Sequence, residues 1–332
     1  MGGKYGYTFL EQPLSARIAA LGGNQISIND NDINAGFVNP SLISPGIDNS
    51  LSMNYVNFFS GVNYGSVQYA NTFNKAGSFL GSIQFMDYGT FDYADDAGNL
   101  GGTFGASDFA FSLGWGRRLD SSFSIGASAK LIYSFYEGYN SFGFAVDVAG
   151  TYFTKSGWAM SVIASNMGMQ ITTFTSGTRD PLPFNLQYAV SKRLDHVPFR
   201  FSFIYNHIEK WDLTYEDPTN PSGGTDPITG EPVEQSGIAT FADQFMSHIV
   251  IGGEIYLGKN LVLRGGYNYL RRQEGKTTTK AGMAGFSWGL GVRIYKFKIN
   301  YARTTYNQVG SPNYISLVFD IKSFTNDEVV RF

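Results

Sequence analysis

The 332-residue chain contains no cysteine, few charged residues and no long apolar run. Without cysteine there is no disulfide scaffold, no thiolate metal site and no cysteine nucleophile. Charged residues make up 15% of the chain, against about 25% in soluble domains. No stretch reaches the ~18 consecutive apolar residues of a membrane-spanning helix. The low charge content and the absence of long apolar runs favour a protein that contacts an apolar environment without membrane-spanning helices.

Charge and motif content exclude further classes of function. A net charge of −3 gives no basic surface for nucleic acid. The three histidines are scattered without metal-ligand spacing, and there is no HExxH motif or Walker loop. We therefore expect no enzymatic activity, no cofactor and no metal. Asp217, Asp226 and Glu231 leave calcium binding open as an alternative, although turn formation explains them more simply.

What the chain does contain is period-2 alternation, rich in aromatic residues and glycine. In "SFSIGASAKLIYSF", Phe123 and Leu131 lie on one face, while Ser128 and Lys130 lie on the other. Such alternation predicts β-strands with one apolar face. The predicted strands are 51–59, 62–73, 78–88, 107–117, 122–136, 140–153, 158–168, 183–192, 198–207, 247–257, 261–271, 283–294, 297–305 and 314–324.

Strand length and connection length decide between a soluble sandwich and a membrane barrel. Many predicted strands have ten or more residues, which suits the ~9–11 of a tilted membrane strand better than the ~5–6 of a globular one. Short connections alternate with mostly long ones, as in outer-membrane barrels. We therefore predict an all-β fold, a transmembrane antiparallel β-barrel of about 14 strands (50–324), with a tail at 325–332. An even strand number would place both barrel ends in the periplasm and the long loops outside the cell.

Residues 1–49 do not alternate. "SARIAALGG" predicts a short helix that ends at Gly22 and Gly23, and turn-forming residues follow. The segment could hang free or enter the barrel. Its apolar side chains would be costly to leave in water, so we expect a plug inside the lumen.

Charged residues at the polar parity of the strands predict a network inside the barrel. The predicted hairpin register places Glu254 opposite Arg264, and two cations, Arg293 and Lys298, opposite each other. The predicted network, including the acidic residues that could balance these cations, comprises Asp30, Asp32, Glu254, Arg264, Arg293, Lys298 and Asp320. We expect it to anchor the plug; an anion or ligand site is the alternative.

Several segments resemble a known family of barrels. "SARIAALGGN" followed by Asn39-Pro40-Ser41 resembles the fatty-acid-transporter-like superfamily, although Ser41 departs from the usual alanine. "YVNFFSGVNYGSVQYA", "PFRFSFIYNHIEKWDLTYEDP", "TDPITGE" and "GYNYLRRQE" resemble the PorQ family, which is similar to PorV and is part of the type IX secretion system of the Bacteroidetes. The resemblance implies a non-enzymatic outer-membrane barrel that holds the surface protein PorZ in an attachment complex with PorU and PorV. Outer-membrane lipid is a further expected partner, and lipopolysaccharide binding is left open.

The long polar connection 208–246 is the predicted docking surface for that partner. It combines interface-type aromatic residues with an expected amphipathic helix at 238–248. The predicted docking residues are Trp211, Asp212, Tyr215, Glu216, Asp217, Phe241, Phe245 and Met246. A lid over the barrel mouth is the alternative role of this loop. For the whole chain, the alternative function is a transporter of hydrophobic small molecules; residues 1–49 disfavour an open porin.

Overall fold

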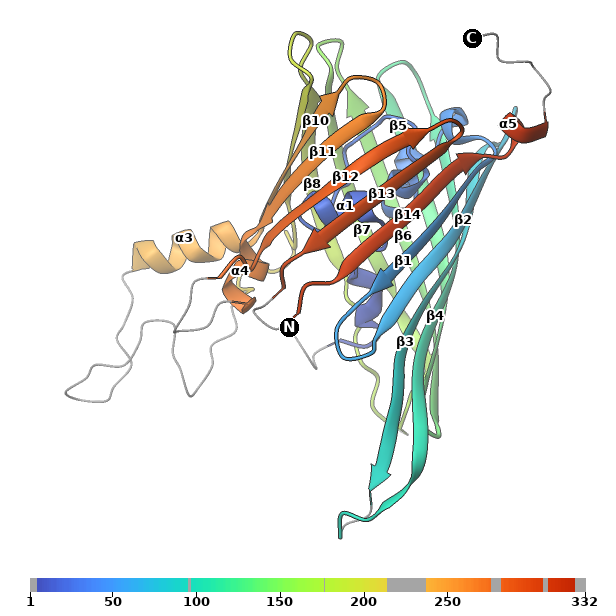
Figure 1. Cartoon of the computed structure of the whole chain (residues 1–332), viewed down its shortest axis with the longest axis vertical. Helices are drawn as coiled ribbons and strands as arrows, with labels where there is room; N and C mark the ends of the chain where they lie inside the picture. Colours follow the sequence, from blue (N-terminus) through green and yellow to red (C-terminus); the bar gives the residue numbers. More distant parts are fainter. Residues whose placement is uncertain are drawn as a thin grey trace.

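The computed structural model describes residues 5–94, 97–175, 177–213, 237–275, 282–306 and 310–325. Fourteen antiparallel strands pair in sequence order, and β1 closes the barrel against β14 (Figure 1). The strands are β1 (Ser50–Asn57), β2 (Asn63–Phe73), β3 (Gly77–Ala94), β4 (Leu100–Arg118), β5 (Phe123–Tyr136), β6 (Tyr139–Phe153), β7 (Trp158–Thr172), β8 (Asn185–Arg193), β9 (Phe199–Tyr205), β10 (Ile249–Leu257), β11 (Leu261–Asn268), β12 (Phe286–Ile294), β13 (Phe297–Thr304) and β14 (Asn313–Asp320). The predicted fold class and strand number are confirmed.

Alternation along the strands separates an inner from an outer face. In β5, Ser128 and Lys130 are buried towards the lumen, whereas Leu131 and Tyr133 are exposed on the outside. Exposed outer residues are largely apolar throughout the barrel, which is the arrangement of a lipid-facing wall.

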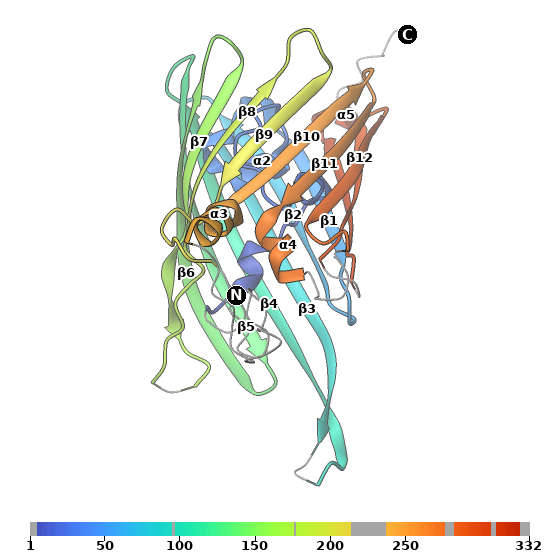
Figure 2. The ribbon, with the colours of Figure 1, turned by 90° about the vertical axis from the view of Figure 1, so that its left-hand side faces the viewer.

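The ends of several strands differ from the prediction. β3 and β4 continue as a long two-stranded ribbon through most of the expected loop 89–106, and this ribbon projects well beyond the barrel (Figures 1 and 2). The predicted strand 261–271 ends at Asn268, because Tyr269–Gly275 forms helix α4. Strand β14 likewise gives way to α5 (Lys322–Thr325). In the part of the chain that the structure describes, no helix is long and apolar enough to cross a membrane.

The N-terminal segment lies inside the barrel. It contains η1 (Thr8–Glu11), α1 (Ala16–Ala20), α2 (Ile33–Val38), η2 (Pro40–Leu42) and η3 (Pro45–Ile47). The Ser15 side chain caps α1, and the Asp32 side chain caps α2. The predicted helix in "SARIAALGG" is confirmed, and it ends before Gly22 and Gly23, which both have positive φ.

The plug packs its apolar side chains against the inner wall. Leu21, Ile26 and Ile33 are at most 1% exposed. Two wall glycines let the plug backbone approach closely. A Cβ at Gly126 would lie 2.2 Å from the Pro40 carbonyl group, and one at Gly266 would lie 2.2 Å from the Gly22 nitrogen. The wall is therefore shaped for this segment.

Candidate functional site

A buried ionic network joins the plug to the barrel wall, and Arg17 of α1 lies at its centre. Its guanidinium donates to both Glu254 oxygens, at 2.9 and 2.8 Å. It also donates to both Asp30 oxygens, at 2.8 and 2.6 Å, and to Asp32 at 2.9 Å. Such charge-assisted, bidentate bonds are stronger than neutral hydrogen bonds, so Arg17 fixes the plug to β10.

Two wall arginines complete the network. Arg200 of β9 lies 2.7 Å from Asp30 and 3.1 Å from Glu254, and Arg264 of β11 lies 2.8 Å from Glu254. Three cations thus balance three carboxylates, which is the condition for burying charge at tolerable cost. Burial would raise the pKa of the Asp30 carboxyl, but the guanidinium groups of Arg17 and Arg200 hold it well below its usual range. The Asp30 carboxylate therefore stays ionised, and its ion pairs hold the plug against the barrel wall.

The structure brings together four of the seven residues that the sequence placed in this network: Asp30, Asp32, Glu254 and Arg264. The predicted register of Glu254 against Arg264 is confirmed. Sequence reasoning missed Arg17 and Arg200. Arg200 is at an inward-facing position of the alternating segment "PFRFSFIY", so the alternation could have predicted it. Arg17 was missed because the short helix "SARIAALGG" was interpreted from its apolar residues.

The other three residues do not join the network. Arg293 does lie opposite Lys298, but both are exposed near the short turn between β12 and β13. Asp320 is also exposed, and its carboxylate accepts the Lys322 backbone N–H at 2.9 Å. Their placement in the lumen was wrong, because they occupy strand ends beyond the packed plug, where water solvates the charges.

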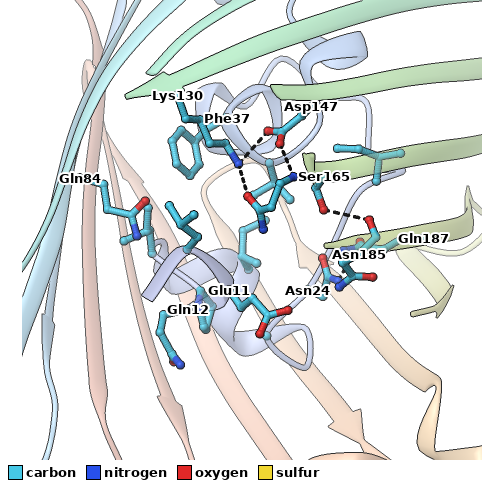
Figure 3. A pocket seen from close by; sticks show the side chains of 18 residues that line it. Glu11, Gln12, Asn24, Phe37, Gln84, Lys130, Asp147, Ser165, Asn185 and Gln187 are labelled. Carbon is cyan, nitrogen blue, oxygen red and sulfur yellow. Dashed lines mark hydrogen bonds and ion pairs between the residues drawn. The ribbon is translucent and has the colours of Figure 1, made fainter. Parts of the chain in front are cut away.

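A cavity of about 110 Å³ lies between the plug and the wall (Figure 3). The plug side is largely apolar and includes Leu14, Ile18 and Phe37, with Glu11 as its charged member. The wall side is polar and includes Lys130 and Asp147. The cavity is thus amphipathic, and its lining divides along the plug–wall boundary.

The polar wall of this cavity is built around a β-bulge. The β6–β7 register shifts between Val146 and Val148, and Asn166 has φ +59°. Asp147 accepts the Asn166 backbone N–H at 2.8 Å, and it lies 2.8 Å from Lys130 Nζ. Lys130 also donates to the Asn166 side chain at 2.8 Å. The ion pair holds the bulge, and the carboxylate satisfies a backbone group that the irregular ladder leaves unpaired.

A second pocket, of about 200 Å³, lies between the plug and the loop that joins β1 to β2. Aromatic and aliphatic side chains dominate its lining, and none of the lining residues carries a charge. The lining residues are Thr8, Phe9, Gln12, Phe58, Phe59, Ser60, Val62, Met86 and Tyr88. We call it the mouth pocket; its chemistry suits a small apolar molecule.

The short helix η1 separates the mouth pocket from the lumen cavity. Thr8 and Phe9 line the first, Leu10 and Glu11 line the second, and Gln12 lines both. The Glu11 side chain is 33% exposed. Partial removal of water by the surrounding protein raises its pKa to about 7, with the Glu209 charge adding to the effect. Helix η1, which separates the two cavities, therefore carries a carboxyl group that changes charge near neutral pH.

The predicted docking residues fall into three groups. Trp211 lies against Phe241, with ring centroids 5.3 Å apart, and Phe241 lies parallel to Phe245 at 6.5 Å. Met246 is half-buried on the same helix, α3 (Gly237–Ser247), and Asp212 lies near Trp211 in sequence. The remaining predicted docking residues, Tyr215, Glu216 and Asp217, lie outside the described residues, as do the calcium candidates Asp226 and Glu231.

Comparison with solved structures finds several barrels of similar architecture. The toluene transporter TbuX of Ralstonia pickettii aligns over 94% of this chain and 98% of its own, with a TM-score of 0.52 and 12% identity. The toluene transporter TodX of Pseudomonas putida aligns over 92% and 97%, with a TM-score of 0.52 and 11% identity. A Pseudomonas aeruginosa FadL homologue aligns over 92% and 98%, with a TM-score of 0.52 and 10% identity. No protein-family profile and no curated protein sequence matches the chain.

The chain therefore shares the fold of these barrels. In this chain, fourteen strands enclose an N-terminal segment that buried ion pairs hold inside. Among the described residues, no group of three or more histidine, aspartate or glutamate side chains is arranged to hold a metal ion.

Proposed function

We propose that the chain is a non-enzymatic barrel of the outer membrane that admits small hydrophobic compounds through its outer mouth. The observation that carries the proposal is the mouth pocket. It is uncharged, rich in aromatic side chains and large enough for a single small molecule. The shared fold of the two toluene transporters supports this direction, by analogy of fold alone.

Passage beyond the mouth pocket requires movement of the plug. Gln12 borders both cavities, and residues of η1 line each of them. A shift of η1 would join the two cavities, while the ionic network would keep the rest of the plug in place. In the proposed path, η1 moves, while the part of the plug around Arg17 stays in place.

A pair of matched valine substitutions tests the proposal. Val62 lines the mouth pocket, whereas Val67 is exposed on the outer face of β2. Val62→Trp should fill the pocket and reduce the uptake of radiolabelled toluene into proteoliposomes with a lipopolysaccharide outer leaflet to the protein-free level, while Val67→Trp should leave uptake unchanged. Uptake no faster than in protein-free vesicles, or equal uptake by Val62→Trp and wild type, would reject this function.

A second function, anchoring a surface protein of the type IX secretion system such as PorZ, with PorU and PorV in the wider complex, is favoured by two observations. The ionic network holds the plug inside the lumen, which suits an anchor better than an open channel. The β3–β4 ribbon projects from the barrel with Phe91, Tyr93 and Leu100 exposed. Exposed aromatic residues on a projecting ribbon suit a protein partner.

Affinity purification from the outer membrane tests this second function. The wild-type barrel should retain the surface partner, and a variant with Phe91, Tyr93 and Leu100 changed to serine should lose it. A matched control changes Phe109, Phe111 and Leu113, which are exposed on the barrel part of β4. Retention by the ribbon variant at wild-type levels would show that the ribbon is not the contact.

A further inference from the structure

Helix α3 has the opposite polarity from a surface helix of a soluble protein. Its apolar side chains face outward: Ile238 is 84% exposed, Phe241 57% and Phe245 40%. The helix projects sideways from the barrel next to the start of β10 (Figure 1). A contiguous apolar face of this kind marks an interaction surface.

The polar face of α3 is turned towards the protein. Asp243 accepts hydrogen bonds from Tyr269 and Gln273 of α4. Gln244 accepts one from the Trp211 indole at 2.8 Å. His248, which directly follows the helix, has its two ring nitrogens 2.7 and 3.0 Å from main-chain carbonyl oxygens. These contacts fix the orientation of the helix, and its apolar face is therefore held on the outside of the protein.

The apolar face continues the outer surface of the barrel wall. Phe245 lies 5.7 Å from Tyr205, measured between ring centroids. Tyr205 belongs to the outward set of β9, which alternates with the buried residues Arg200, Ser202 and Ile204. From Tyr205 the aromatic surface runs through Phe245 and Phe241 to Trp211. Tyrosine and tryptophan are the residues enriched where a membrane surface meets water.

The wall beside α3 includes the shortest strand of the barrel. β9 has 7 residues, whereas a membrane strand needs ~9–11. A helix lying across the end of this strand adds the apolar surface that it lacks. It contains no lysine, arginine or glutamate, and its one acidic side chain, Asp243, is bonded inward. The face therefore fits acyl chains and offers nothing for an anionic headgroup.

We propose that α3 lies in the outer leaflet, parallel to the membrane surface, with Ile238, Phe241 and Phe245 among the acyl chains. The proposal rests on the membrane setting of the proposed function, but not on what the barrel transports or anchors. It assigns to lipid the same side chains that the sequence suggested for protein docking. Interfacial helices with one apolar face take this position generally.

Single-cysteine variants test the proposal cleanly, because the chain has no cysteine of its own. Nitroxide labels are placed at Ile238→Cys, Phe241→Cys and Phe245→Cys in purified protein reconstituted into phosphatidylcholine vesicles. Leu263→Cys, on the outer face of β11, is the lipid control, and Ser156→Cys, in the exposed turn before β7, is the water control. Collision with oxygen reports lipid, and collision with a water-soluble nickel chelate reports water.

The expected result is an oxygen-to-nickel accessibility ratio at all three helix positions that matches Leu263→Cys and is severalfold above Ser156→Cys. A ratio like that of Ser156→Cys would overturn the proposal, because the face would be in water. Low accessibility to both reagents would also overturn it and would indicate a second copy packed on the helix. If Leu263→Cys itself has the low ratio of a site in water, the barrel is not in the membrane and the proposed function is wrong. That result is distinct from a low ratio at the α3 positions alone.

A substitution that leaves the labelled site intact provides the second measurement. Phe241→Ser with Phe245→Ser should raise nickel accessibility at Ile238→Cys severalfold, because the helix loses its hold on the acyl chains. Retention of the compact electrophoretic form in unheated samples shows that each variant is still a folded barrel. Unchanged nickel accessibility in this folded variant would contradict the proposal.

Discussion

Replacing Arg17 with methionine should release the plug. Methionine has a similar length but removes five charge-assisted hydrogen bonds to three carboxylates. Arg200 and Arg264 then face Asp30, Asp32 and Glu254, so the buried cluster carries an unbalanced negative charge. Removing one member of a buried ion pair costs about 3–5 kcal/mol. Because Arg17 belongs to the plug, this cost falls on docking of the plug in the lumen.

The cost converts directly into a change of equilibrium. At about 1.4 kcal/mol per factor of ten, it shifts the ratio of released to docked plug by about 100-fold to several thousand-fold. Single-channel recording in planar bilayers measures this shift as the frequency of large openings. The wild-type barrel should open rarely, and Arg17→Met should open often.

A double variant separates lost charge balance from lost packing. Arg17→Met with Glu254→Gln leaves two cations and two carboxylates in the cluster, so its effect should be smaller than the sum of the two single changes. If Arg17→Met opens no more often than wild type, the network does not hold the plug. Strict additivity in the double variant would refute the reasoning from charge balance.

Three further predictions concern the plug and the wall. The pKa of Glu11 is raised to about 7, so its contribution to stability is present below its ordinary pKa of about 4.5 and is lost as pH rises through 7. Glu11→Gln should therefore flatten the pH dependence of thermal stability between pH 5 and 8, and an unchanged profile would contradict this. Gly126→Val should displace η2, because its Cβ would collide with Pro40; protease cleavage of the plug should increase, but not in Ala127→Val on the outer face. Lys130→Met should leave Asp147 buried without its cation and cost about 3–5 kcal/mol, measured as a lower temperature for the loss of compact electrophoretic mobility. Adding Asp147→Asn should recover part of that loss, whereas a wild-type transition in Lys130→Met would be contrary to the proposed role of the ion pair.

The barrel was predictable from sequence because a two-residue period forces side chains to alternate between lumen and lipid. The same period predicted that Glu254 lies opposite Arg264, since a short turn fixes the register of its hairpin. Parity alone does not say how far along the lumen a side chain lies. Arg293 and Lys298 therefore have the expected register but lie at the rim.

The plug contacts were less accessible to sequence reasoning. The acids Asp30 and Asp32 could be named because they stand out in a segment of low charge. Their partner Arg17 is 13 to 15 residues away along the chain, and the position of its helix against β12 and β13 depends on packing that has no period. The mouth pocket was missed for the same reason, because Phe9 and Phe58 meet only once the plug is in place.

The position of the plug has a consequence for the order of folding. Ala16 donates its backbone N–H to Ser316 of β14, 300 residues along the chain, and Arg17 meets Glu254 across 237 residues. Contacts of such long range form late, since the entropy of closing so large a loop must be lost before they contribute. The binding partners of α1 are assembled only when the last strands, β10 to β14, have paired. Insertion of the plug therefore marks completion of the barrel, and a chain stalled before β14 would leave its first helix without a place to dock.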